Sequence, residues 1–449
     1  MGNRAMAFII LFVISASAAS AQQYADIILY GGNILTANRP RPDDSSVVEA
    51  VAVRGDRIVG IGRNEEILKM AGPQTLKIDL EYKAVIPGRI DTQAPPGENF
   101  RNHAEELLAE GVTTVGMHLS STSLGVIQKL ELPLRVAYAT EVSLRDPNAE
   151  TLLENSEPAS SSPRFWNTGF YLASVDGPEN SAAACMSKGD SRSCLPTEKL
   201  KSVINAILKR GGRATFDIHG DKALDDFLEV LESFSAQYDI RQKRFGVEHC
   251  AAIRKDQVAR AAKFDIAFSC DPPLGVHLED GTKSTATEIL FGRQEGGDMR
   301  APLRTMIDAG LRPSLQTDSV NYYSFLATQQ LVVRSFPNTR LLGPQQRISR
   351  QEALHTSTRW AAEYLGKENE LGSIEVGKYA DIAVLDRNYI QVRQDGLNEI
   401  NVLVTIVGGK IVYTEPDYAN RKGLPQVGYR GNLGSVLIRG RLTDKLPYQ

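Results

Sequence analysis

The sequence predicts an α/β protein in which a parallel sheet is covered by helices and flanked by β-rich segments at both chain ends. Strand-like and helix-like runs alternate through the middle of the chain in units of about 30 residues. Glycine-punctuated strand patterns occupy both ends. The 449 residues are 42% hydrophobic, enough for a large core, and the net charge of −3 offers no basic surface for nucleic acid.

The first 21 residues predict a signal peptide, from the positive charge of Arg4, the apolar run 5–14 and the small residues 19–21. The apolar run is too short to span a bilayer. We therefore expect a secreted or periplasmic protein with no integral membrane segment after cleavage.

The N-terminal β-rich segment, residues 22–86, contains three groups of predicted strands. Residues 25–36 form two short strands around a Gly-Gly pair, residues 50–62 form a hairpin with a Gly-Asp turn, and residues 76–80 form a further strand. The C-terminal segment, residues 372–449, contains strand patterns of the same kind. Each half alone would leave one sheet face exposed, and pairing the two halves would cover it.

Between these segments, strands and helices alternate. The predicted strands span residues 84–86, 112–115, 134–139, 214–216, 244–247, 265–269 and 313–315. The predicted helices span residues 102–110, 199–209, 222–234, 255–263, 303–309 and 350–365. Residues 146–165 and 275–300 are rich in polar and turn-forming residues, which indicates loops, and the second is either an exposed loop or a lid.

Two motifs are informative about the family. A Pro-Gly turn leads from strand 84–86 into Ile90-Asp91-Thr92, and residues 372–381 read Gly-Ser-Ile-x-x-Gly-Lys-x-Ala-Asp. Both resemble the amidohydrolase superfamily, and the resemblance is closest to its amidohydrolase-3 subgroup. The resemblance implies a (β/α)8 barrel over residues 87–371, beside a β-sandwich built from both chain ends. In such a barrel the site lies at the carboxyl ends of the strands.

The resemblance also implies metal ligands that this chain has partly lost. The family has two histidines after the first strand, and Gln93 and Pro95 stand there. The place of the mid-barrel lysine is taken by Leu172, and Asp217 replaces the histidine after the fifth strand. The sixth-strand Glu-His, with His249, and the eighth-strand Thr-Asp, with Asp318, are intact. A dinuclear centre is therefore not expected.

The remaining donors suit one Zn²⁺-like ion. Asp217, His219, His249 and Asp318 form the predicted metal site, because carboxylate and imidazole are ligands that such an ion accepts. The alternative is that no metal binds. Asp318, by analogy with the family, is also the predicted catalytic acid and base.

Two further residues are candidates for substrate binding. Asp271, before a Pro-Pro pair, occupies a place where the family often contacts substrate, and His118 ends a predicted strand. No role is assigned to His103, His277 and His355, which are expected on surfaces.

Each site residue also has a structural alternative. His219 precedes a Gly-Asp turn and could hydrogen-bond the local backbone. His249 could be packed among the strand ends without binding metal, and Asp318 could cap the following helix.

The four cysteines have an expected role in an exported protein. Cys185 and Cys194 are predicted to form a disulfide that closes a polar loop. Cys250 and Cys270 either pair or pack as two small hydrophobic residues.

These features leave three functions open. The first is an exported hydrolase acting on a non-peptide carbon–nitrogen bond, such as an amide or cyclic amide, with an altered mononuclear metal site. The second is a catalytically inactive protein with a binding or regulatory role in the periplasm. The third is metal-independent lactone hydrolysis or isomerisation by Asp91, Asp217, Glu248 and Asp318. The first and third imply a small-molecule substrate, the second implies a small-molecule or protein ligand, and none predicts the oligomeric state.

Overall fold

A computed structural model describes residues 24–39, 46–96, 99–155, 161–176, 185–188, 194–272, 286–318, 324–335 and 341–431. Eight parallel strands form one sheet in the order β15-β14-β13-β12-β11-β10-β9-β8. They are β8 (Arg89–Asp91), β9 (Val112–Leu119), β10 (Arg135–Ser143), β11 (Phe165–Ala173), β12 (Ala214–Ile218), β13 (Gly246–His249), β14 (Ala267–Cys270) and β15 (Ser314–Leu315).

The sheet curls into a nearly closed barrel. The first and last strands meet where the Thr92 N–H donates to the Leu315 carbonyl at 3.3 Å and the Thr92 hydroxyl donates to the same oxygen at 3.0 Å. The seam is tight at the neighbouring strand, where only a glycine, Gly116, leaves room for the Thr92 backbone. The fold predicted for the middle of the chain is thereby confirmed.

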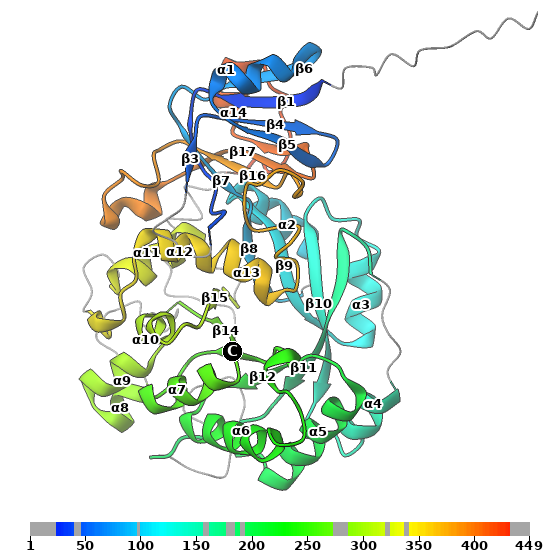
Figure 1. Cartoon of the computed structure of the whole chain (residues 1–449), viewed down its shortest axis with the longest axis vertical. Helices are drawn as coiled ribbons and strands as arrows, with labels where there is room; N and C mark the ends of the chain where they lie inside the picture. The colour runs from blue at the N-terminus through cyan, green and yellow to red at the C-terminus, as the bar shows by residue number, and fades with distance from the viewer. Residues whose placement is uncertain are drawn as a thin grey trace, which may run out of the picture.

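Helices cover the outside of the barrel (Figure 1). They are α2 (Phe100–Ala109), α3 (Ser121–Gln128), α4 (Ala149–Asn155), α5 (Thr197–Arg210), α6 (Asp221–Phe234), α7 (Lys255–Lys263), α8 (Ala286–Phe291), α9 (Arg293–Met299), α10 (Leu303–Asp308), α11 (Ser324–Val333), α12 (Arg350–Thr356) and α13 (Arg359–Tyr364). In α6 the apolar residues recur at helical spacing as Leu224, Phe227, Leu228 and Leu231, and all four are buried. This stripe packs against the barrel strands, as amphipathic helices do in this fold.

Both chain ends build the additional sheets, which lie together above the barrel in Figure 1. One sheet has the order β5-β4-β1-β6, from β1 (Ala25–Tyr30), β4 (Ala50–Arg54), β5 (Arg57–Gly62) and β6 (Ala71–Asp79). The other has the order β18-β17-β16-β7-β2-β3, from β2 (Asn33–Leu35), β3 (Val47–Val48), β7 (Ala84–Pro87), β16 (Ile382–Leu385), β17 (Val402–Val407) and β18 (Lys410–Thr414). Short helices α1 (Asn64–Ile67) and α14 (Pro416–Lys422) accompany these strands.

The two sheets share one apolar core, as the sequence predicts. Strand β7 pairs antiparallel with β16, with Val85 opposite Val384, so that residues nearly 300 apart become neighbours. Ile27 and Val53 of the first sheet belong to the same buried cluster as Val85, Val384 and residues of the other strands of the second sheet. Burying both inner faces at once explains why neither half needs to fold alone.

Three expectations about local structure were wrong. The helix predicted over residues 350–365 is two helices, because the chain breaks at Ser357 and Thr358, and the Ser357 carbonyl accepts the Ile90 N–H at 2.7 Å instead of an intrahelical partner. The predicted loop 275–300 contains α8 and α9, and the predicted loop 146–165 contains α4. Residues 273–285, the centre of the suggested lid, lie outside the described residues, as do residues 1–21 and 432–449.

Both cysteine pairs form disulfides. Cys185 is bonded to Cys194, which confirms that prediction, and Cys250 is bonded to Cys270. Across the described part of the chain, no helix combines the length and the apolar character that crossing a membrane requires.

Candidate metal centre

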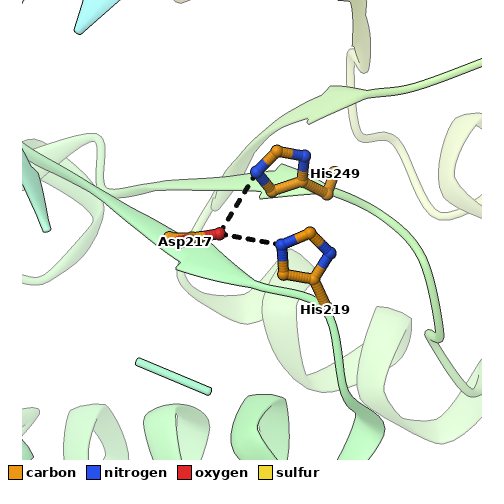
Figure 2. A group of neighbouring side chains, drawn as sticks. All are labelled: Asp217, His219 and His249. Atoms are coloured by element: carbon orange, nitrogen blue, oxygen red, sulfur yellow. Dashed lines mark ion pairs between the residues drawn. The ribbon is translucent and has the colours of Figure 1, made fainter. Parts of the chain in front are cut away.

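Three of the predicted ligand residues meet at the carboxyl ends of two neighbouring barrel strands. Asp217 is on β12, His219 follows that strand, and His249 ends β13. Asp217 Oδ1 lies 3.0 Å from His219 Nε2 and 3.1 Å from His249 Nε2, so both imidazoles point at one carboxylate oxygen (Figure 2). The two rings stack at a centroid distance of 4.1 Å.

The geometry of this group fits a metal ion better than a hydrogen-bonded cluster. None of the three converging atoms of Asp217, His219 and His249 has a hydrogen-bond partner of acceptable geometry, although all are buried. Ligands about 2.0–2.1 Å from a tetrahedral ion stand about 3.3 Å apart, close to the distances found here. A carboxylate with two imidazoles is also the chemistry that Zn²⁺ and similar ions select.

A buried carboxylate places the His219 turn. Asp176 Oδ1 accepts the His219 N–H at 2.9 Å, and Asp176 Oδ2 accepts the Gly220 N–H. The Ser174 N–H donates to Asp217 Oδ2 at 3.3 Å, which leaves Asp217 Oδ1 for the two imidazoles. Burial raises the pKa of Asp176 to about 6.

The other ring nitrogen of His249 faces a second group of acidic residues. His249 Nδ1 lies 3.4 Å from Asp271 Oδ2 and 3.8 Å from Asp318 Oδ2. Gln316 Nε2 lies 3.2 Å from the same nitrogen and donates to Asp271 Oδ1 at 3.0 Å. Because Asp217 and Asp318 approach opposite nitrogens of one imidazole, these four predicted ligands do not converge on a single point.

The residue at the first-strand ligand position contacts the eighth-strand carboxylate directly. Gln93 Nε2 donates to Asp318 Oδ1 at 2.8 Å. Asp91 secures the seam behind this pair, because its Oδ1 accepts the N–H groups of Gln93 at 3.2 Å and Thr317 at 3.0 Å. Burial raises the pKa of Asp91 to about 6. Asp91 therefore has a structural role at this seam.

His118 belongs to a different polar group. Its Nε2 lies 3.1 Å from Glu248 Oε2, and its ring stacks on Tyr171 at 3.4 Å between centroids. The Tyr364 hydroxyl donates to Glu248 Oε1 at 2.7 Å. Strands β9 and β13 lie on opposite sides of the barrel, so the contact between His118 and Glu248 crosses the barrel interior.

Charge within the metal group is strongly perturbed. Burial alone would raise the pKa of Asp217, but His219 and His249 hold that pKa well below its ordinary value. Burial would lower the pKa of His249, but Asp217 and Asp271 raise it well above its ordinary value. The site thus holds negative and positive charge together in a buried place, a pattern frequent at functional sites.

The sequence reasoning anticipated the residues of this region but not their grouping. Asp217, His219 and His249 come together, whereas Asp318 lies with Asp271 on the far side of the His249 ring. His118 lies beside Glu248 instead of these residues.

Two supporting residues were missed altogether. Gln316 lies two positions before Asp318 and Asp176 lies four positions after Leu172, yet neither belongs to a recognisable ligand pattern. His355, expected on a surface, is fully buried.

Known proteins resemble this chain in sequence and in fold. A family model described as "Amidohydrolase family" matches residues 98–413. Protein LONG AFTER FAR-RED 3 of Arabidopsis thaliana is 28% identical over 247 residues, which are 54% of this chain and 40% of that protein. N-substituted formamide deformylase of Arthrobacter pascens is 36% identical over 221 residues, which are 49% of this chain and 38% of that protein. The chain therefore aligns with well under half the length of either relative.

Other similarities extend further along the chain. Imidazolonepropionase of Streptococcus pyogenes is 24% identical over 378 residues, 75% of this chain and 83% of that protein. An uncharacterized metal-dependent hydrolase of Pyrococcus furiosus superimposes with a TM-score of 0.63 at 18% identity, covering 81% of this chain and all (100%) of that one. An atrazine chlorohydrolase of Arthrobacter aurescens, solved with zinc, gives 0.59 at 15% identity, with coverage of 92% and 99%. The structural matches establish the shared fold.

Proposed function

This chain belongs to the amidohydrolase family, and we propose that it hydrolyses a non-peptide carbon–nitrogen bond of a small molecule, such as an amide or cyclic amide. In this proposal one divalent, Zn²⁺-like ion is held by Asp217, His219 and His249. The observation that carries the proposal is the convergence of three buried donor atoms at 3.0 and 3.1 Å without hydrogen-bond geometry. Leaving such donors unsatisfied would be costly unless an ion occupied their common point.

The roles of the residues follow from their exposure. An ion at this point would supply Lewis-acid polarisation of the scissile carbonyl and a water of lowered pKa. Asp318 is the most exposed carboxylate around His249, with 29% of its side chain accessible compared with 22% for Asp271 and 9% for Asp217. Its Oδ1 is oriented by the Gln93 amide, and we assign it the transfer of the proton to the leaving nitrogen.

Two relatives support the choice of bond. One is named N-substituted formamide deformylase and another imidazolonepropionase, and both names indicate chemistry at carbon–nitrogen bonds outside peptides. The fold itself is compatible with many reactions, so the bond class rests on these relatives together with the donor set.

We further infer that the protein is exported. The composition of residues 1–21 supports this, and so do the two disulfides, since such bonds persist mainly outside the cytosol. Fractionation of cells producing the full chain tests the inference, with export expected to deliver it to the periplasm or the medium.

A second candidate is a catalytically inactive binding protein. It is favoured by one observation, that Gln93 holds Asp318 through a direct hydrogen bond at the position where the family has a metal-binding histidine. In this candidate the donors of Asp217 and the two histidines no longer bind an ion, and the carboxyl ends of the strands serve recognition alone.

Metal analysis separates the candidates. Purified protein dialysed against Zn²⁺ should hold close to one equivalent by plasma emission spectroscopy. Asp217→Ala and His249→Ala should each release it, whereas His103→Ala, which removes a histidine of α2, should not. A panel of N-substituted formamides and cyclic amides then tests hydrolysis, with Asp318→Asn expected to keep the metal and lose activity. Protein that holds no metal, or that keeps it in both ligand variants, would refute the proposal.

A further inference from the structure

We propose that Asp271 is a positioning residue that holds the proton of His249 on Nδ1, so that Nε2 presents its lone pair to the ion. This inference rests on the proposed metal site. It gives Asp271 a different role from the substrate contact expected from the sequence. Ligating histidines commonly donate their second ring N–H to a carboxylate, and such partners contribute strongly to metal affinity.

The orientation of Asp271 supports this role. Its Oδ1 accepts an N–H of Gln316 at 3.0 Å, which turns Oδ2 toward His249 Nδ1 at 3.4 Å. The Gln316 amide is itself oriented, because its Oε1 accepts the hydroxyl of the buried Ser269. Flipping that amide would place Gln316 Oε1 against Asp271 Oδ1, two acceptors facing each other.

Gln316 also offers the competing arrangement, in which its Nε2, 3.2 Å away, donates to an unprotonated His249 Nδ1. The imidazole proton would then lie on Nε2 and should form a hydrogen bond with Asp217 Oδ1. An ion at the proposed site decides between the two arrangements, because a metal ligand must present the lone pair of Nε2 and so cannot carry its proton there. The proton then lies on Nδ1, where the Asp271 carboxylate at 3.4 Å is an acceptor and the Gln316 Nε2 group is not.

The backbone holds the two residues at this separation. The disulfide joins Cys250, next to His249, with Cys270, next to Asp271. The Asp271 N–H donates to the His249 carbonyl at 3.2 Å. His249 and Cys250 have φ of +74° and +55°, a conformation that residues other than glycine adopt only when their surroundings enforce it.

The test is Zn²⁺ affinity of the full chain with its disulfides intact, measured by competition with a chromogenic chelator. Asp271→Ala should weaken binding about 10- to 100-fold. Asp271→Asn, which keeps one acceptor oxygen, should fall between Asp271→Ala and the wild type. Asp256→Ala, which removes an exposed carboxylate of α7, should bind as the wild type does.

A second readout separates positioning from packing. With ¹⁵N-histidine labelling of the six histidines, alanine variants of the four that are not proposed ligands (His103, His118, His277 and His355) identify their own signals in long-range ¹H–¹⁵N spectra of the Zn²⁺ form, and the remaining two sets belong to His219 and His249. The wild type should show a protonated Nδ1 and coordination through Nε2, and Asp271→Ala should perturb the Nδ1–H signal. Coordination through Nδ1, or unchanged affinity in Asp271→Ala, would overturn this inference alone. A wild type that binds no Zn²⁺ would overturn it together with the proposed function.

Discussion

The two disulfides should contribute similarly to stability but differently to metal binding. They close loops with sequence separations of 9 residues for Cys185–Cys194 and 20 for Cys250–Cys270. Chain-entropy estimates for these loops are about 2.6 and about 3.3 kcal/mol. Replacing either pair by alanine should therefore lower the melting temperature of this 449-residue chain by roughly 3–4 °C.

Only the Cys250–Cys270 disulfide joins the residues next in sequence to His249 and Asp271. Cys250→Ala/Cys270→Ala should thus weaken Zn²⁺ binding about 10-fold or more, because His249 would no longer be held in its left-handed conformation. Cys185→Ala/Cys194→Ala reaches the site indirectly, through Asp176, whose side chain accepts the His219 N–H, and through the Cys185 carbonyl, which accepts the Lys222 N–H at 3.1 Å. This change should weaken binding much less.

The assay pairs calorimetric melting of the metal-free proteins with chelator competition at 25 °C, where both variants remain folded. Equal losses of affinity would mean that the disulfides act only through global stability. Unchanged affinity in Cys250→Ala/Cys270→Ala, with a lowered melting temperature, would show that the bridge does not position His249.

Three further predictions concern the scaffold. Burial lowers the pKa of His355 to about 4 from 6.5. The contribution of neutral His355 to the free energy of unfolding should therefore be full above pH 6.5 and be lost, by up to about 3 kcal/mol, as the pH falls from 6.5 through 4. His355→Gln should flatten that dependence in urea unfolding. Asp381→Ala would leave the charge of the buried Arg135 without its carboxylate partner, which lies 2.7 Å from Arg135 Nε. It should lower the free energy of unfolding in urea by about 3–5 kcal/mol, whereas Arg135→Met/Asp381→Leu should lower it much less. Gly116→Ala would place a Cβ 2.0 Å from the Thr92 oxygen and should destabilise the chain by about 3 kcal/mol in the same assay, whereas Gly125→Ala, in α3 with open space around it, should be neutral or stabilising.

The barrel was predictable because its evidence is repeated along the chain. Each strand–helix unit carries its own alternation of apolar patterns, so an error in one unit leaves the topology intact. Asp217 and His219 were found for a related reason, since residues two apart on an extended chain face the same side. The sixth- and eighth-strand residues were located by motif, which places a residue at a strand end without telling which atom it faces.

What sequence could not supply was the direction of the imidazole. Whether Asp318 shares an ion with Asp217 depends on which nitrogen of His249 each approaches, and that follows from backbone angles that no residue pattern encodes. His355 was expected on a surface because it is polar, but α12 is buried on nearly every side, polar residues included. The pattern of polar and apolar residues therefore does not separate buried from exposed positions in this helix. The break at Ser357 arises from a long-range bond to the Ile90 N–H, which local helix propensity cannot reveal.

Gln93 decides whether this scaffold could hold a second ion. Its Nε2 stands 2.8 Å from Asp318 Oδ1, so a donor at this position reaches the eighth-strand carboxylate. Gln93→His alone would pair one imidazole with that carboxylate, too few ligands for tight binding, and the Zn²⁺ content should stay near one equivalent. Gln93→His/Pro95→His would add a second imidazole from the same side of the chain, and three donors should bind a second equivalent weakly. A second equivalent in the single variant, or none in the double variant, would mean that the missing histidines are not what limits this site.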